Sequence, residues 1–372
     1  MTGRVFPRWR LVQRSLAIVL VTAALAPTRL LANDARDDSS LLAFLSARGS
    51  ERFNADRPRG RPEQGEALAD VLYTYSRGAL HILAEGDAST DDAQLDRLQI
   101  GWEAVPETLV WLGKFHEPAS SWNFGHDHGH YLQTAISTPS IERWTDDAGV
   151  LPENITGLLF DSRHRTGAEA AVQVSLAAGI VPNPTPRTDN SYWVRTVSAG
   201  EHRVGWSARL AMLPDYASTN SFGLLAARHR LDASGLETIG RFDARTVNQS
   251  VYGVYADGDW GQWSLHATAY YVELSLQATS KPRTESFIAG YAQLERRFAD
   301  RYTVYARHEN AARAPESTYL RAVHSNFAVR RNLAGARWDF TRHQAITLEI
   351  ERTTALTNRF TRIGLQWSAV VP

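Results

Sequence analysis

Apolar and polar residues alternate over stretches of about ten residues along most of the chain after residue 33. Segment 203–212 reads RVGWSARLAM, and segment 263–271 places Trp, Leu, Ala, Ala and Tyr at every second position. Successive side chains of a β-strand point to opposite faces, so each such segment has one apolar and one polar face. Because no apolar run after residue 33 is long enough for a spanning helix, the pattern favours a closed barrel with lipid outside and water inside.

The alternation predicts an all-β fold, a transmembrane antiparallel up-and-down barrel of about 14 strands, with 12–16 as the range. The candidate strands cover residues 68–84, 93–104, 107–116, 154–163, 167–180, 201–213, 219–230, 246–257, 261–275, 285–298, 301–310, 324–338, 343–353 and 359–371. Every second link between them is short, and the intervening links are longer and more polar. Outer-membrane barrels have this asymmetry, with short periplasmic turns and long extracellular loops. A soluble β-sandwich is the alternative, but its strands would be shorter.

The N-terminus divides into two predicted segments before the barrel at 68–372. Residues 1–32 have the composition of a signal peptide, with a basic start, an apolar core at 15–26 and a small-residue cleavage site at 30–32. The core is too short for the roughly 20 residues of a spanning helix, so cleavage is favoured over a membrane anchor. Residues 33–67 are polar and rich in Arg and Asp, and we expect a flexible periplasmic segment there.

Composition narrows the classes of function. The chain has 40 basic and 40 acidic residues, and five of the basic residues lie in the predicted signal peptide, which contains no acidic residue. The remaining chain is therefore mildly acidic, which excludes a general nucleic-acid binder on electrostatic grounds. Cysteine is absent, so the sequence holds neither a disulfide framework nor a lipoprotein anchor.

The polar faces of the predicted strands describe a water-filled interior. A basic side chain on the lipid face costs about 2–4 kcal/mol at mid-bilayer, so charged residues on strands are expected to point inward. We predict that the pore is lined by Arg97, Glu103, Lys114, His116, Glu169, Arg203, Arg209, His266, Glu349, Glu351 and Arg362. About 14 strands enclose a space too wide for side chains to close. A barrel plugged by an inserted loop is the alternative.

The longest link, 117–153, opens with a histidine-rich stretch. Residues 113–131 read GKFHEPASSWNFGHDHGHY, and an acidic stretch ending in Gly-Val-Leu-Pro closes at 152. This stretch of 40 residues resembles Gram-negative outer-membrane porin-like β-barrel proteins of a poorly characterised group. The last strand resembles their C-terminal signal strand, although Pro372 stands where an aromatic residue is usual. The resemblance implies a channel and a location in the bacterial outer membrane.

The histidine tract is a candidate metal site. His126, His128 and His130 alternate, with Asp127 between two of them, and imidazole and carboxylate groups bind Zn²⁺ or Cu²⁺. Residues two apart on a strand are about 6–7 Å apart, so three histidines reach one ion only if the backbone bends. The alternative is a structural loop that packs into the barrel through histidine hydrogen bonds and constricts the pore.

These observations predict a porin-like channel for passive diffusion of small hydrophilic solutes or ions, constricted by loop 117–153. The alternatives are a transition-metal-interacting channel that uses the tract at 126–130, or an outer-membrane hydrolase. No enzyme is expected, since the chain has no Gly-x-Ser-x-Gly, no phosphate-binding glycine loop and no His-Glu-x-x-His. The expected partners are outer-membrane lipids, the barrel-assembly machinery and small solutes or ions. No cofactor is expected apart from Zn²⁺ or Cu²⁺ at the histidine tract. Assembly into a homotrimer stays open.

Overall fold

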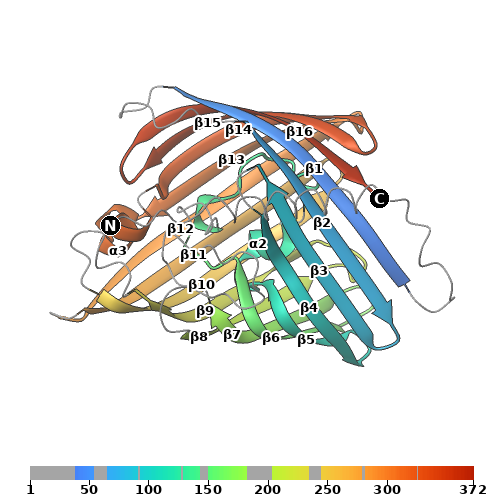
Figure 1. Cartoon of the computed structure of the whole chain (residues 1–372), viewed down its shortest axis with the longest axis horizontal. Coiled ribbons are helices and arrows are strands. Elements are labelled where there is room, and N and C mark those ends of the chain that lie inside the picture. Colours follow the sequence, from blue (N-terminus) through green and yellow to red (C-terminus); the bar gives the residue numbers. More distant parts are fainter. Residues whose placement is uncertain are drawn as a thin grey trace, which may run out of the picture.

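Sixteen antiparallel strands close into a barrel in the computed structural model (Figure 1). The structure describes residues 38–53, 65–90, 93–126, 129–142, 150–181, 203–233, 244–278, 281–324 and 326–372. The strands are β1 (Asp38–Phe53), β2 (Glu66–Arg77), β3 (Leu80–Ser89), β4 (Ala93–Val105), β5 (Thr108–His116), β6 (Asn154–Arg165), β7 (Ala171–Val181), β8 (Arg203–Leu213), β9 (Ser221–Asp232), β10 (Ala244–Trp260), β11 (Trp263–Ala278), β12 (Arg283–Phe298), β13 (Tyr302–Ala312), β14 (Ala328–Thr341), β15 (Gln344–Ala355) and β16 (Arg359–Val371). Each strand pairs with its neighbours in sequence, and β1 pairs with β16 to close the ring.

Within the part of the chain that the structure describes, short helices occupy two of the links. They are α2 (Ser121–His126), the 3-10 turns η1 (Ser140–Glu142) and η3 (Ala314–Glu316), and α3 (Thr318–Val323). Among the described residues, no helix is long and apolar enough to cross a membrane. The predicted signal peptide at 1–32 lies outside the described residues.

The predicted strand at 68–84 is wrong, because it is two strands. Strands β2 and β3 form a hairpin in which Arg77 pairs with Leu80. Gly78 has φ +57°, a conformation that glycine adopts without the steric penalty of a side chain. The alternation of apolar residues continues on both sides of this turn, so periodicity alone did not mark the break. This split accounts for one of the two strands beyond the predicted fourteen.

The other additional strand is β1, which corrects the prediction of a flexible segment at 33–67. Residues 38–53 pair with β2 on one side and with β16 on the other. Polar residues at both ends of this strand hide its alternation, and only 41–45 form an apolar patch. Closure supplies the physical reason: without β1, the edges of β2 and β16 would expose unpaired backbone groups at membrane depth.

The two faces of the wall have the polarity of a membrane barrel. Large apolar side chains on the outer face are exposed, such as Val204 (69%), Leu112 (62%) and Leu348 (53%). Polar side chains on the inner face are buried, among them Gln293, Glu349 and Glu351. This arrangement inverts that of a soluble protein and agrees with lipid outside and a polar interior.

The two ends of the barrel differ in their links. Seven short turns join β2–β3, β4–β5, β6–β7, β8–β9, β10–β11, β12–β13 and β14–β15, and they share one end, called here the short-turn end. The remaining links, including 117–153, lie at the opposite long-loop end. This asymmetry agrees with the short and long links that the sequence predicts.

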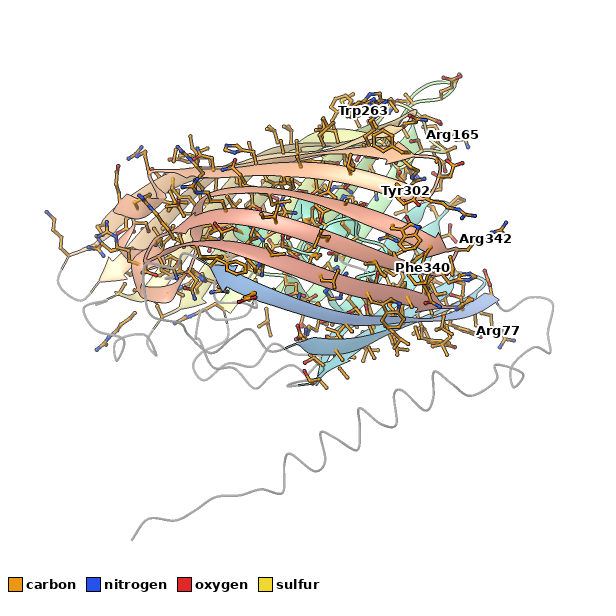
Figure 2. All side chains as sticks on the ribbon, turned by 90° about the horizontal axis from the view of Figure 1, so that it is seen from above. Arg77, Arg165, Trp263, Tyr302, Phe340 and Arg342 are labelled. Atoms are coloured by element: carbon orange, nitrogen blue, oxygen red, sulfur yellow. The ribbon has the colours of Figure 1, made fainter. Side chains whose placement is uncertain are left out.

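Aromatic side chains gather at the short-turn end. Figure 2 shows Trp263, Tyr302 and Phe340 there, beside exposed arginines. The rings of Tyr302 and Trp338 stack with centroids 6.3 Å apart. Aromatic rings of this kind anchor a barrel at a membrane interface. Trp111 of β5 does not belong to this belt. Its ring lies over Gly101 of β4, so closely that a Cβ added at Gly101 would overlap it.

The main hydrophobic core lies inside the barrel. Its apolar side chains come from the end of β5, from link 117–153, from strands β6–β12 and from α3, and include Phe115, Trp122, Ile141, Val251 and Leu320. A sixteen-stranded wall cannot fill its own interior with side chains. The core therefore forms where inserted segments pack against the wall.

Candidate functional site

The link between β5 and β6 is called here the inward loop (residues 117–153). Its described parts, 117–126, 129–142 and 150–153, lie inside the barrel against the inner wall. Figure 1 places α2 of this loop within the ring of strands. The loop leaves β5 at the long-loop end and reaches the short-turn end, where the Tyr131 hydroxyl donates to the Arg342 carbonyl at 2.8 Å. It then returns through η1 to β6. The inward loop thus extends along the barrel interior from one end to the other.

Glu142 joins the descending and returning parts of the inward loop to the wall. Its carboxylate accepts from the Ser120 hydroxyl at 2.6 Å and the Trp122 amide at 2.7 Å. It also accepts from the Tyr270 hydroxyl of β11 at 2.9 Å. Glu142 is 1% exposed, and burial raises the pKa of this carboxyl although its hydrogen bonds oppose the shift.

The returning part of the loop is held by charged side chains of β13 and β15. Glu349 accepts from the Ile136 amide at 3.1 Å and from the Ser137 hydroxyl at 2.7 Å. Arg307 donates to the Ser137 carbonyl at 2.6 Å. Glu309 accepts from the Ser140 amide at 2.9 Å. Buried charges here satisfy loop backbone groups that would otherwise lack partners.

The same charged residues form one buried network. Arg307 lies 2.9 Å from Glu309, and Arg331 lies 3.3 Å from Glu309 and 2.5 Å from Glu351. Arg362 of β16 reaches Glu351 at 3.0 Å. Glu309 and Glu351 therefore each face at least one guanidinium, and this part of the wall that holds the loop has compensated charges.

The inward loop also contacts β8 and β1. The Arg209 guanidinium of β8 lies 5.1 Å from the ring centre of Phe124. Gly129 packs against the Phe44 ring of β1 so closely that an added Cβ would overlap it. These contacts place the loop across the interior as well as along one wall.

The structure places eight of the predicted pore-lining residues in four kinds of environment. Arg97, Glu349, Glu351, Arg362 and His266 point inward from strands. Glu349 accepts from the Tyr305 hydroxyl at 2.9 Å, and the other four each lie in an ion pair. Arg209 also points inward, over aromatic rings. Arg203 begins β8 and is half-buried. Glu103 ends near a short turn and accepts from the Glu107 amide at 3.1 Å.

Three predicted lining residues lie elsewhere. Glu169 is exposed and precedes β7, so it does not lie on a strand; the strand predicted at 167–180 begins four residues later. Lys114 is buried, and its ammonium donates to the Leu95 carbonyl at 2.5 Å. His116 is buried at the base of the loop, where its Nδ1 lies 2.7 Å from the Asn123 carbonyl.

Acidic side chains gather in one sector of the inner wall, where Arg97 of β4 pairs with Glu85. Asp70, Glu85 and Asp87 lie on β2 and β3, whereas Arg203 and Arg209 lie on β8. The acidic sector was missed because its three residues fall in the segment predicted as one strand and the turn after it.

The structure brings together a metal-compatible group that differs from the predicted one. His126 of α2, Asp257 of β10 and His266 of β11 place one ligand atom each within 4.8 Å of one another, the one such group among the described residues. Asp127 and His128 lie outside the described residues, and His130 is not in this group. Asp257 was missed, although it pairs with His266 across the short turn at 261–262.

The serines near His116 do not form a nucleophile pair with it. Ser120 and Ser121 both donate to Glu142. The imidazole of His116 instead contacts the Asn123 carbonyl. The hydroxyls of these two serines thus serve to hold the inward loop.

Solved structures share this architecture. OmpT of Vibrio cholerae, folded in vitro, is 12% identical with a TM-score of 0.58 over 92% of this chain and 100% of that chain. The outer membrane channel DcaP of Acinetobacter baumannii is 10% identical with a TM-score of 0.56, over 91% and 99%. OmpF of Salmonella typhi in complex with daunomycin is 11% identical with a TM-score of 0.56, over 90% and 97%. The chain has the fold of an outer-membrane β-barrel protein. The predicted resemblance is thus confirmed at the level of the fold.

No protein-family model and no curated protein sequence matches the chain. OmpT of Vibrio cholerae also has a trimer form, with a TM-score of 0.55 to this chain at 13% identity.

Proposed function

We propose that this barrel is an outer-membrane channel for passive diffusion of small hydrophilic solutes or ions, narrowed by the inward loop. The observation that carries the proposal is the docking of residues 117–153 inside a sixteen-stranded wall. A wall of this size encloses more space than its own side chains fill. A loop fixed inside it narrows that space to a size that selects among solutes.

The path that we propose runs along the sector of β2, β3 and β4, because the buried apolar core occupies the interior beside β6–β12. The hydrogen bonds that hold the loop concentrate on β11, β13 and β15. The sector of β2–β4 presents Asp70 and Asp87 together with the paired Glu85 and Arg97. Since both signs are present, we expect weak selectivity between cations and anions and preference for polar over apolar solutes.

The outer membrane channel DcaP of Acinetobacter baumannii supports the proposal through its shared fold. The trimer form of Vibrio cholerae OmpT supports a homotrimer as the assembly to test first. We further propose that the outer face contacts outer-membrane lipids, because its exposed side chains are apolar.

Single-channel recording in planar bilayers tests the function. The chain without residues 1–32 is refolded and added at low concentration, and discrete conductance steps are expected. A variant in which a short Gly/Ser linker replaces residues 121–142 serves as the matched control, because it removes the constriction and leaves every strand intact. A correctly folded barrel that gives no steps with or without the loop would contradict the channel, and assays for lipid and peptide hydrolysis would follow.

A further inference from the structure

A histidine of the inward loop meets an aspartate and a histidine of one hairpin of the wall. His126 Nε2 lies 2.5 Å from Asp257 Oδ2, and His266 Nδ1 lies 2.8 Å from Asp257 Oδ1. Asp257 and His266 are direct partners in the β10–β11 register. Two of the three groups therefore come from rigid neighbouring strands, and the third comes from α2.

We propose that His126, Asp257 and His266 form a site for a divalent transition-metal ion, Zn²⁺ above all, that fastens the inward loop to the barrel wall. Imidazole nitrogen and carboxylate oxygen are the ligands that zinc takes in proteins outside cysteine sites. Three protein ligands leave a fourth position for water or a solute group. The predicted tract at 126–130 thus contributes one ligand, and the wall contributes two.

The positions of the three groups require little movement to hold an ion. Ligands at 2.0–2.1 Å from zinc in a tetrahedron lie about 3.3 Å apart. The pairs of atoms at 2.5 and 2.8 Å therefore have to open by about 0.5–0.8 Å, and the widest pair, within 4.8 Å, has to close by at most about 1.5 Å. His126 can make this shift because it ends a six-residue helix within a loop. The hairpin that carries Asp257 and His266 keeps its register.

Neighbouring groups orient the ligands as metal sites require. The other ring nitrogen of His266, Nε2, lies 3.5 Å from the Glu295 carboxylate. A carboxylate behind a ligating histidine fixes its tautomer and strengthens the metal bond. Trp122 packs against His126 with ring centroids 5.1 Å apart and so limits rotation of that imidazole. Asp257 and Glu295 together carry the charge that balances a divalent ion.

The site is open to ions that enter the interior. The side chains of His126 and Asp257 are 26% and 27% exposed, and that of His266 is 16% exposed. Binding would direct His126 Nε2 and His266 Nδ1 to the metal, with a proton retained on His266 Nε2 towards Glu295, and any further protons released to water. No electron transfer is involved.

Calorimetric titration of the full chain in detergent micelles with Zn²⁺ tests the site. We expect one ion per chain, and binding weakened at least tenfold in His266→Ala and in His126→Ala. Glu295→Gln should weaken binding by about 10–100-fold, as other losses of an orienting carboxylate do. His343→Ala, an exposed histidine of a short turn, is the matched control and should bind as the parent does.

Cobalt substitution distinguishes ligation from a structural role. Co²⁺ bound at this site should give visible absorption that His126→Ala alters, and this variant changes a loop residue and leaves the strands intact. If His130→Ala abolishes zinc binding while His126→Ala and His266→Ala do not, the ion belongs to the histidine tract and the proposal is overturned. Unchanged binding in all three variants overturns it as well. Because these measurements are made in micelles, they do not depend on conductance, and their outcome is separate from that of the proposed channel.

Discussion

At the scale of single residues, docking of the inward loop depends on buried groups with several partners each. Glu142 is the clearest case, since its two oxygens serve both loop segments and β11. A buried donor that loses its acceptor costs about 1–3 kcal/mol. The loop position is therefore more sensitive to this one carboxyl than to any apolar contact of similar size.

Glu142→Ala should release the inward loop without unfolding the barrel. The change leaves the Trp122 amide and the hydroxyls of Ser120 and Tyr270 without their acceptor, so docking should weaken by about 3 kcal/mol. Hydrogen exchange of residues 121–142 measures the docking free energy directly. Gln249→Ala is the milder comparison, because it removes one hydrogen bond to the Val150 carbonyl. It should lose less docking free energy than Glu142→Ala. Equal exchange in the parent chain and Glu142→Ala would contradict this role.

Docking of the loop should also weaken as the pH rises. Burial raises the pKa of Glu142 above its ordinary value of 4.5, so the docked loop binds a proton more tightly than the released loop. Between 4.5 and the raised value the docked state holds more protons, and its stability falls with increasing pH. Hydrogen exchange of the loop amides, measured from pH 4 to pH 8, should therefore accelerate more than exchange of unprotected amides does over the same range. Glu142→Gln should remove this extra pH dependence of hydrogen exchange. If the extra dependence persists in Glu142→Gln, another titrating group causes it.

Gly129→Ala should displace the tip of the inward loop. Gly129 has φ +61°, a conformation that costs other residues about 1 kcal/mol, and a Cβ there would overlap the Phe44 ring. We expect larger fluctuations of single-channel current than in the parent chain. The double variant Gly129→Ala/Phe44→Ala should show smaller current fluctuations than Gly129→Ala, because it removes the overlap and keeps the backbone strain. No recovery would mean that strain alone acts.

At the scale of elements, the sequence predicted strands wherever both faces have distinct polarity. It failed at β1, whose polar ends mask the alternation, and at Gly78, where alternation continues through a turn. Both errors have one physical origin. Pairing between strands is decided by closure of the ring, and closure leaves no mark in the local pattern.

The inward loop was predicted to enter the barrel, but its partners could not be. Glu142 meets Tyr270, and Ser137 meets Glu349, across more than a hundred residues of sequence. Those contacts depend on which strands face the loop, which follows from the strand count and register. The histidine tract directed attention to His126, whereas Asp257 became visible only through its pairing with His266.

Replacing residues 121–142 with a short Gly/Ser linker should increase single-channel conductance severalfold. The backbone bonds of the wall run between neighbouring strands, so the barrel should still close without the loop. Larger neutral solutes should then enter in liposome-swelling assays. The same linker length inserted after residue 313, at the long-loop end outside the inward loop, is the control and should leave conductance unchanged. Unchanged conductance in the loop variant would show that the constriction lies elsewhere.

At the scale of the whole molecule, the apolar outer band predicts how charge is tolerated with depth. Leu348 lies in the middle of β15 on the outer face and is 53% exposed, whereas Val105 is 55% exposed beside a short turn. Leu348→Arg should destabilise the barrel in lipid vesicles by about 2–4 kcal/mol, and Val105→Arg by about 0–1 kcal/mol. Similar exposure of the two positions makes them a matched pair that differs in depth alone. Urea unfolding in vesicles measures both. Equal losses would mean that residues 105 and 348 share one environment, and the lipid band would have to be placed elsewhere on the wall.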